Sequence, residues 1–122
     1  EARDKSCEEG LKFVIKNIEK MSLVAGTHNE KSSFFLAELM ENAQLPKDDR
    51  RIWFSQLYGM SDNLSFNLAK EGYKVVKYLP FGPVNETLPY LIRRAEENSA
   101  AGGQTSRELK LIEKELKRRG LE

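Results

Sequence analysis

Residues 52–60, IWFSQLYGM, decide the fold because they contain its clearest strand. The first six of these residues are rich in β-branched and aromatic side chains, which favour an extended strand, and Gly59 ends the run. The turn-forming sequence QLPKDDR precedes them at residues 44–50. A short apolar run between two turns is typical of a strand buried in a sheet, so we predict a strand over residues 52–57.

Outside this strand, the apolar spacing predicts further strands and helices in alternation. Capping boxes, in which Ser or Thr precedes Glu by three residues, mark three helix starts. These are Ser6 with Glu9, Thr27 with Glu30, and Thr105 with Glu108. In chain order we expect a helix at 6–19, a strand at 21–25, a helix from Thr27, the strand at 52–57, a short helix ending near Gly72, a strand at 75–79, a helix at 85–98 and a last helix from Thr105.

This alternation predicts an α/β fold with parallel strands joined by helical crossovers. Three parallel strands make a poor free-standing sheet, because such a sheet needs both faces and both edges covered. An eight-stranded βα barrel needs roughly 250 residues, which is far more than the 122 of this chain. We therefore expect the last three βα units of a (βα)8 barrel, TIM-like, plus a carboxyl-terminal helix, incomplete on its own.

Composition narrows the classes of function. Twenty basic against nineteen acidic side chains leave a net charge of +1, which removes the electrostatic case for nucleic acid as a partner. Cys7 is the only cysteine, so an intrachain disulfide or a cysteine-based zinc site is excluded, and no metal is expected. The chain has no apolar run near the roughly 20 residues that a membrane span needs. It also begins without methionine, so we expect an excised or processed segment.

The residues that follow each strand are the first candidates for function, because βα proteins carry their sites at the carboxyl ends of strands. Thr27, His28 and Asn29 follow the first strand, where the next helix exposes N–H groups that can hold an anion. This triplet fits either an ordinary helix cap or a phosphate or flavin contact. The other two strands end near Leu57 and Tyr78.

Arg93 and Arg94 are a second candidate, on the helix predicted at 85–98. Neighbouring residues on a helix are about 100° apart, so two arginines can reach one pair of oxygens from different sides. Such a fork suits a carboxylate. Tyr90 and Glu97 lie about one turn away, so a solvated face with an Arg–Glu pair remains the alternative.

Three stretches together resemble the carboxyl-terminal part of the proline dehydrogenases, closest to the mitochondrial form. They are AGTHNE at 25–30, QLYGMSDNLSF at 56–66 and KYLPFGPVNETLPYLIRRAEEN at 77–98. The resemblance implies an FAD enzyme on a βα barrel that oxidises L-proline to Δ1-pyrroline-5-carboxylate and passes electrons to a quinone. Residues 1–104 would belong to the barrel and residues 105–122 to a helical extension.

The resemblance also implies roles for individual residues. The expected substrate contacts are Arg93 and Arg94 at the carboxylate, with Tyr78, Tyr90 and Leu57 around the ring. The expected flavin contacts are Thr27, His28, Asn29 and Glu97. The family's catalytic lysine lies on earlier strands, so no catalytic residue is expected in this chain, and an N-terminal barrel segment is an expected partner.

The same resemblance implies a cellular location for the protein. It implies a mitochondrial enzyme at the matrix side of the inner membrane, with peripheral membrane association. Residues 108–120 are basic and amphipathic, and they fit a solvated packing helix better than a contact with a membrane or a partner helix. Two other functions stay open: another flavin-dependent barrel oxidoreductase, such as methylenetetrahydrofolate reductase, or a non-catalytic α/β interaction or regulatory fragment.

Overall fold

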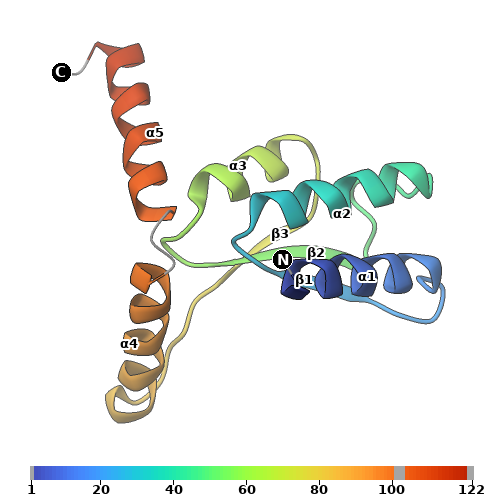
Figure 1. Ribbon diagram of the computed structural model, residues 1–122, viewed down its shortest axis with the longest axis horizontal. Helices are drawn as coiled ribbons and strands as arrows, with labels where there is room; N and C mark the ends of the chain where they lie inside the picture. The colour runs from blue at the N-terminus through green and yellow to red at the C-terminus, as the bar shows by residue number, and fades with distance from the viewer. Residues whose placement is uncertain (1, 101–103, 121–122) are drawn as a thin grey trace. The chain divides into compact units, whose positions relative to one another are not determined.

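The computed structural model describes residues 2–100 and 104–120, with side chains for residues 5–96 and 109–120. Its elements appear in Figure 1. They are α1 (Ala2–Lys16), β1 (Leu23–Gly26), α2 (Glu30–Asn42), β2 (Ile52–Leu57), α3 (Asp62–Lys70), β3 (Val75–Tyr78), α4 (Val84–Ala100) and α5 (Gln104–Arg119). The chain divides into two compact units, residues 1–78 and residues 79–122.

The first unit contains a parallel sheet in the order β1-β2-β3. Leu23 of β1 pairs with Ile52 of β2, and Leu57 of β2 pairs with Tyr78 of β3. The predicted α/β alternation and the parallel strands are therefore confirmed. Residues 52–57 form β2 as predicted, because turns bound their apolar run on both sides.

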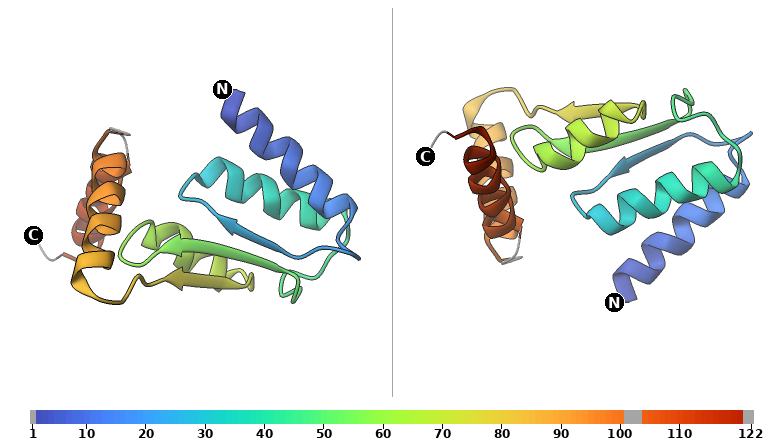
Figure 2. Two further views of the ribbon diagram at one scale, coloured as in Figure 1. Left: turned by 90° about the horizontal axis from the view of Figure 1, so that it is seen from below. Right: turned by 90° about the horizontal axis from the view of Figure 1, so that it is seen from above.

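The two faces of this sheet differ in burial. Alternate residues of β2 are buried on one face, namely Ile52, Phe54 and Gln56. In Figure 2 the strands lie in front of α3 when seen from below and behind it when seen from above, and Figure 1 places α2 on the same side as α3. The helices α2 and α3 thus cover one face, and α1 packs against α2. The other face carries half-buried or exposed side chains such as Val24.

The core lies between the covered face and the helices. It consists of Leu11, Ile15, Ile18, Ala25, Leu36, Met40, Ile52, Phe54, Leu64 and Leu68. The ring of Phe54 meets that of Tyr73 edge to face, with centroids 5.4 Å apart. Burial of these apolar side chains supplies the main stabilising free energy of the first unit.

The predicted start of the first helix is wrong. α1 begins at Ala2 and ends at Lys16, so Ser6 lies inside the helix and does not cap it. A Ser followed three residues later by Glu also occurs within helices, where both residues face solvent, and spacing alone does not distinguish the two cases. The predicted cap of the last helix, Thr105 with Glu108, lies outside the described side chains.

A buried carboxylate fixes the turn that leads into β2. Asp49 is only 6% exposed and accepts hydrogen bonds from the Arg51 backbone N–H at 2.9 Å, from Nε at 3.0 Å and from Nη2 at 2.7 Å. The Arg51 Nη1 donates to Glu19 at 3.0 Å, which ties the segment after α1 to the same turn. These hydrogen bonds, those of the Arg51 side chain first, lower the pKa of Asp49 from 3.8 to about 2.

We expect Asp49→Asn to lower the free energy of unfolding at pH 7 by about 1–3 kcal/mol, because it removes the charge from three hydrogen bonds at a buried position. Asp49 is more acidic in the folded state, so its contribution is present above pH 3.8 and is lost as the pH falls towards 2. Denaturant unfolding from pH 7 to pH 2 should therefore show a difference that shrinks with acid. Asp48→Asn, at an exposed neighbour, is the control and should change little.

Candidate functional site

The carboxyl edge of the sheet brings two predicted substrate contacts together. Leu57 and Tyr78 are paired across β2 and β3, and the N–H of Tyr58 donates to the carbonyl of Tyr78 at 2.9 Å. Both side chains belong to the face that α2 and α3 leave uncovered, and Tyr78 is 52% exposed while Leu57 is half-buried. They form one apolar and aromatic surface at the end of the strands.

The segment after β1 forms a tight turn rather than the predicted capping box. Asn29 caps α2, since its Oδ1 accepts from the N–H of Lys31 at 3.0 Å. Thr27 Oγ1 accepts from the N–H of Asn29, also at 3.0 Å. The predicted pairing of Thr27 with Glu30 is therefore wrong, because Asn is at least as good an amino-terminal cap as Thr and lies directly before the helix.

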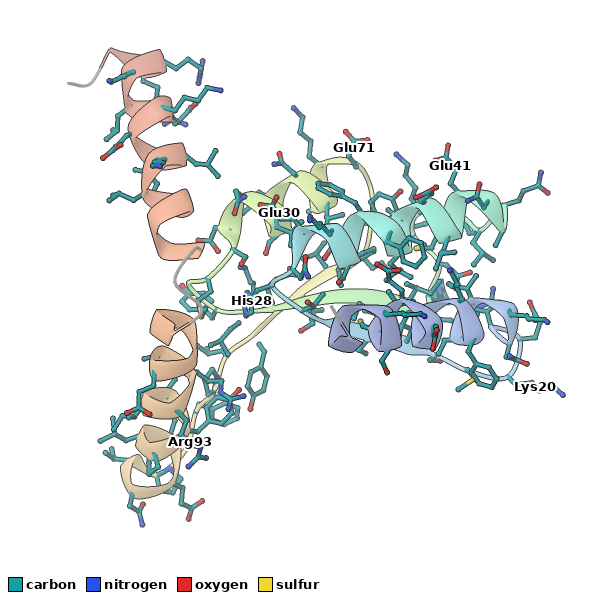
Figure 3. The ribbon with its side chains drawn as sticks, viewed as in Figure 1. Lys20, His28, Glu30, Glu41, Glu71 and Arg93 are labelled. Carbon is teal, nitrogen blue, oxygen red and sulfur yellow. The ribbon has the colours of Figure 1, made fainter. Side chains whose placement is uncertain are left out.

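His28 points from this turn towards the end of β2, and Figure 3 shows it beside the strands. Its Nδ1 lies 2.9 Å from the Oγ of Ser61, and its Nε2 lies 3.5 Å from the backbone nitrogen of Leu57, whose N–H donates to it. The imidazole thus connects the predicted flavin segment with a predicted substrate contact.

The buried polar side chains below this edge were not predicted from the sequence. Gln56 is 1% exposed, and its Nε2 donates to the carbonyl of Thr27 at 3.3 Å. Ser65 Oγ lies 2.9 Å from Gln56 Oε1 and 3.1 Å from the carbonyl oxygen of Ser61. The available signal was a glutamine on the same strand face as Ile52 and Phe54, where an apolar residue is the usual choice.

Lys77 secures the loop between β2 and α3. Its Nζ donates to the carbonyl of Met60 at 2.6 Å and forms an ion pair with Asp62 at 2.7 Å. The lysine lies opposite Gln56 in the β2–β3 register. It holds the loop that carries Ser61, so the polar contacts at the carboxyl edge extend over all three strands.

The second unit holds the predicted carboxylate fork on α4. The guanidinium carbon of Arg94 lies 5.2 Å from the centre of the Tyr90 ring, and both side chains are half-buried. Arg93 is exposed, as Figure 3 shows. Tyr90 therefore stacks with Arg94, four residues on, whereas the sequence spacing suggested a shared face with Arg93. The side chain of Glu97 lies outside the described residues.

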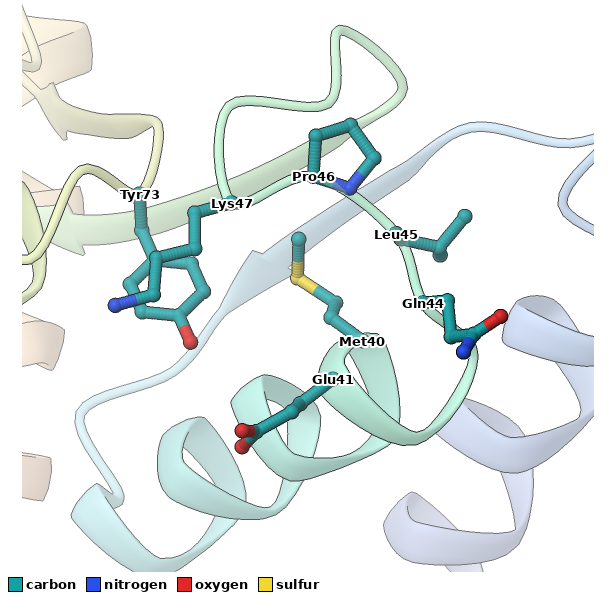
Figure 4. Close-up of a pocket in the computed structure, with 7 residues that line it drawn as sticks. All are labelled: Met40, Glu41, Gln44, Leu45, Pro46, Lys47 and Tyr73. Carbon is teal, nitrogen blue, oxygen red and sulfur yellow. The ribbon is translucent and has the colours of Figure 1, made fainter.

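A cavity of about 390 Å³ lies at the opposite, amino end of the strands (Figure 4). Its lining residues are Met40, Glu41, Gln44, Leu45, Pro46, Lys47 and Tyr73. Lys47 lies over the Tyr73 ring and pairs with Glu71 at 3.1 Å. None of the predicted site residues contributes to this cavity, so it is separate from the carboxyl edge.

The described residues contain neither a candidate metal site nor a helix that could span a membrane. No group of three or more His, Cys, Asp or Glu side chains among them is arranged to hold a metal ion. Of the helices that the structure describes, none has both the length and the apolar character needed to cross a membrane.

A sequence model of proline dehydrogenase matches residues 1–107, which is more than four fifths of the chain. The chain belongs to the proline dehydrogenase family. Human mitochondrial proline dehydrogenase 1 is 46% identical over 105 residues, which cover 86% of this chain and 18% of the human protein. The carbapenem antibiotics biosynthesis protein CarD of Pectobacterium carotovorum subsp. carotovorum is 39% identical over 116 residues, covering 95% of this chain and 30% of CarD.

A solved structure supports the same family. Proline utilization A from Bdellovibrio bacteriovorus, crystallised after inactivation by N-propargylglycine, matches with a TM-score of 0.68 and 27% identity. The match covers 75% of this chain and 9% of the bacterial chain. This member of the proline dehydrogenase family thus spans less than a third of the relatives that it matches, and its parallel α/β arrangement resembles part of proline utilization A.

Proposed function

We propose that these 122 residues act as the carboxyl-terminal part of an enzyme that oxidises L-proline to Δ1-pyrroline-5-carboxylate with FAD. The family match carries this proposal, because it extends over almost all of the described chain. By the complete enzyme we mean the protein with the segments that the longer relatives possess outside this region. Electrons pass from it to a quinone, and residues 105–122 form a helical extension of the barrel portion, residues 1–104.

Helices cover only one face of the sheet, and this favours a barrel rather than an open, doubly wound sheet. In a doubly wound fold, helices cover both faces of the parallel strands, whereas in a barrel they lie only outside. Here α2 and α3 lie on one side, and the other face carries Val24, Leu57 and Tyr78. Within the described residues, β1 and β3 each pair with β2 alone, so each has an edge to which a further strand can add.

The residues at the carboxyl edge fit a flavin. A side-chain carbon added at Gly26 would meet no atom within 4 Å, so no atom of the described residues obstructs the open face at the end of β1. The start of α2 offers N–H groups near Thr27 and Asn29, which suits a phosphate. We assign the flavin contacts to Thr27, His28, Asn29 and Glu97. FAD would supply the redox chemistry by accepting a hydride.

The protein's part in the reaction is to bind and orient proline. The substrate has a carboxylate and a small apolar ring, and these call for cationic and apolar contacts respectively. We assign the carboxylate to Arg93 and Arg94, and the ring to Tyr78, Tyr90 and Leu57. A substrate fixed at both ends presents one carbon in a constant position and is shielded from water, which lowers the barrier without a nucleophilic side chain.

The named relatives support a mitochondrial location. Several are mitochondrial proline dehydrogenases from animals, plants and Dictyostelium, with identities of 39–46%. We propose that the complete enzyme acts in the mitochondrion, at the matrix side of the inner membrane, where a quinone is accessible. Peripheral attachment is sufficient for that reaction, since electrons can leave at the membrane surface.

The visible absorption spectrum tests the proposed function. We expect the complete enzyme to carry flavin bands that bleach when proline is added without oxygen, and the 122-residue chain to carry almost none. The reason is that three of eight strands provide only part of the surface that a flavin needs. A complete protein that binds flavin but bleaches with a folate rather than proline would indicate a different flavin barrel. One without any flavin would contradict the enzyme hypothesis.

A further inference from the structure

Ser61 has an unusual conformation for its position. It is the amino-terminal cap of α3, yet its φ is +51° and its hydroxyl makes no capping hydrogen bond to the helix. A left-handed backbone at a residue other than glycine costs about 1–2 kcal/mol, so something nearby must favour it. The hydroxyl lies instead 2.9 Å from Nδ1 of His28, and Ser61 is only 4% exposed.

The hydrogen bonds determine which tautomer of His28 is present. The backbone N–H of Leu57 can only donate, so Nε2 must accept in that contact and carries no proton. In the neutral ring the proton therefore lies on Nδ1, which donates to the Ser61 hydroxyl. Without this arrangement both contacts of the ring could not form at the same time.

This imidazole also continues the pairing of β1 with β2. The N–H of Thr27 donates to the carbonyl of Ser55 at 3.2 Å, and the β1–β2 register ends at Gly26 with Ser55. The next N–H on β2 that faces β1 is that of Leu57, because alternate residues of a central parallel strand bond to opposite neighbours. Its acceptor is a ring nitrogen of His28 rather than a backbone carbonyl.

Buried partners hold the residues around this bridge in place. Gln56 donates to the carbonyl of Thr27, and Ser65 lies between Gln56 and the carbonyl of Ser61. The Ser65 hydroxyl has one proton, which it can give to either oxygen, and its backbone N–H donates to the Ser61 carbonyl at 3.0 Å. The turns before α2 and α3 are thus joined through the buried side chains of Gln56 and Ser65.

We propose that His28 and Ser61 are positioning residues, in which Ser61 binds Nδ1 and so holds the imidazole where its Nε2 accepts the Leu57 N–H, and the ring fixes Leu57 relative to the Thr27–Asn29 turn. This inference rests on the proposed function for its effect on catalysis. A shift of Leu57 alters the wall of the proline pocket, whereas a shift of the turn alters the flavin contacts. The bridge keeps the distance between these two surfaces constant.

Nuclear magnetic resonance of the 122-residue chain tests the tautomer directly, since His28 is its only histidine. At the alkaline plateau of a pH titration, couplings between the ring nitrogens and the ring C–H protons should show the Nδ1–H form. Ser61→Gly removes the hydroxyl that binds Nδ1 and relieves the left-handed backbone, so we expect the ring to move away from the Leu57 N–H and to shift towards the Nε2–H form common in water. A wild-type ring in the Nε2–H form, or a ring unchanged in Ser61→Gly, would overturn the proposal.

Ser61→Asn provides the rescue, because asparagine tolerates a positive φ and offers a carbonyl oxygen to Nδ1–H. It should retain the Nδ1–H form. In the complete enzyme we expect Ser61→Gly to raise the KM for proline about fivefold with a smaller change in kcat, and Ser61→Asn to restore it. Equal KM values in wild type and Ser61→Gly would refute the positioning role. The resonance experiment uses neither flavin nor proline, so its failure is distinct from a failure of the proposed function.

Discussion

Arg93→Met and Arg94→Met in the complete enzyme should each raise the KM for proline by about 10- to 150-fold while flavin remains bound. This range corresponds to the loss of one hydrogen-bonded charge at a carboxylate, about 1.5–3 kcal/mol. Methionine keeps much of the length and packing of arginine but has neither charge nor donors. Steady-state kinetics with proline, together with the flavin absorbance per protein, would measure both quantities.

Arg50→Met is the matched control, because Arg50 is exposed like Arg93 but lies at the amino end of the sheet. It should leave the KM for proline unchanged. If Arg93→Met and Arg94→Met behave like this control, neither arginine binds the substrate carboxylate. A loss of flavin in the same variants would instead assign them to the cofactor.

The stacking of Arg94 on Tyr90 adds a finer test. Tyr90→Leu should raise the KM in the wild-type background, because the ring both contacts proline and holds the guanidinium group. In the Arg94→Met background the same change should have less effect, since only the direct contact of the ring is lost. Additive effects would mean that the stacking has no role in substrate binding.

The parts of the fold that depend on a few neighbouring residues could be predicted from the sequence. β2 was predicted with its observed bounds because its apolar residues lie between two turns. The start of α1 was wrong, because Ser6 and Glu9 match a capping box without forming one. Apolar runs and turns act over a few residues, whereas a cap depends on which of several polar side chains reaches a free N–H.

The candidate site was predictable only where residues act along one strand or one helix. The topology rule placed Leu57 and Tyr78 at the same edge, and the register confirms that they are neighbours. The bridge from His28 to Ser61 spans 33 positions, and no spacing rule relates residues so far apart. Gln56 showed a local signal, a polar side chain on a buried strand face, but its partner Ser65 depends on how α3 packs.

The open face of the sheet leads to the prediction that separates a barrel from an independent module. Val24 is 63% exposed in this chain, on the face that no helix of the first unit covers. In a complete barrel the same side chain would point into the interior. Val24→Asp should therefore cost about 1 kcal/mol or less in the 122-residue chain, mostly through the lower strand propensity of aspartate.

In the complete enzyme, Val24→Asp should instead abolish accumulation of folded, flavin-bound protein. A carboxylate buried without a partner costs several kcal/mol, which is comparable with the whole stability of a domain, about 5–15 kcal/mol. Val24→Thr keeps the branched shape without the charge and should be tolerated far better. Phe66 on α3 is 71% exposed and is not among the core residues, so Phe66→Asp should be tolerated in both forms.

Unfolding curves of the 122-residue chain and flavin content of the complete enzyme would measure the two effects. If Val24→Asp were tolerated equally in both, the face would remain in solvent in the complete protein, and the barrel would be excluded. The non-catalytic alternative would then gain support, since an exposed apolar face at the carboxyl edge is suited to a partner protein. A selective loss in the complete enzyme would mean that this face is buried there, by further strands or by the flavin.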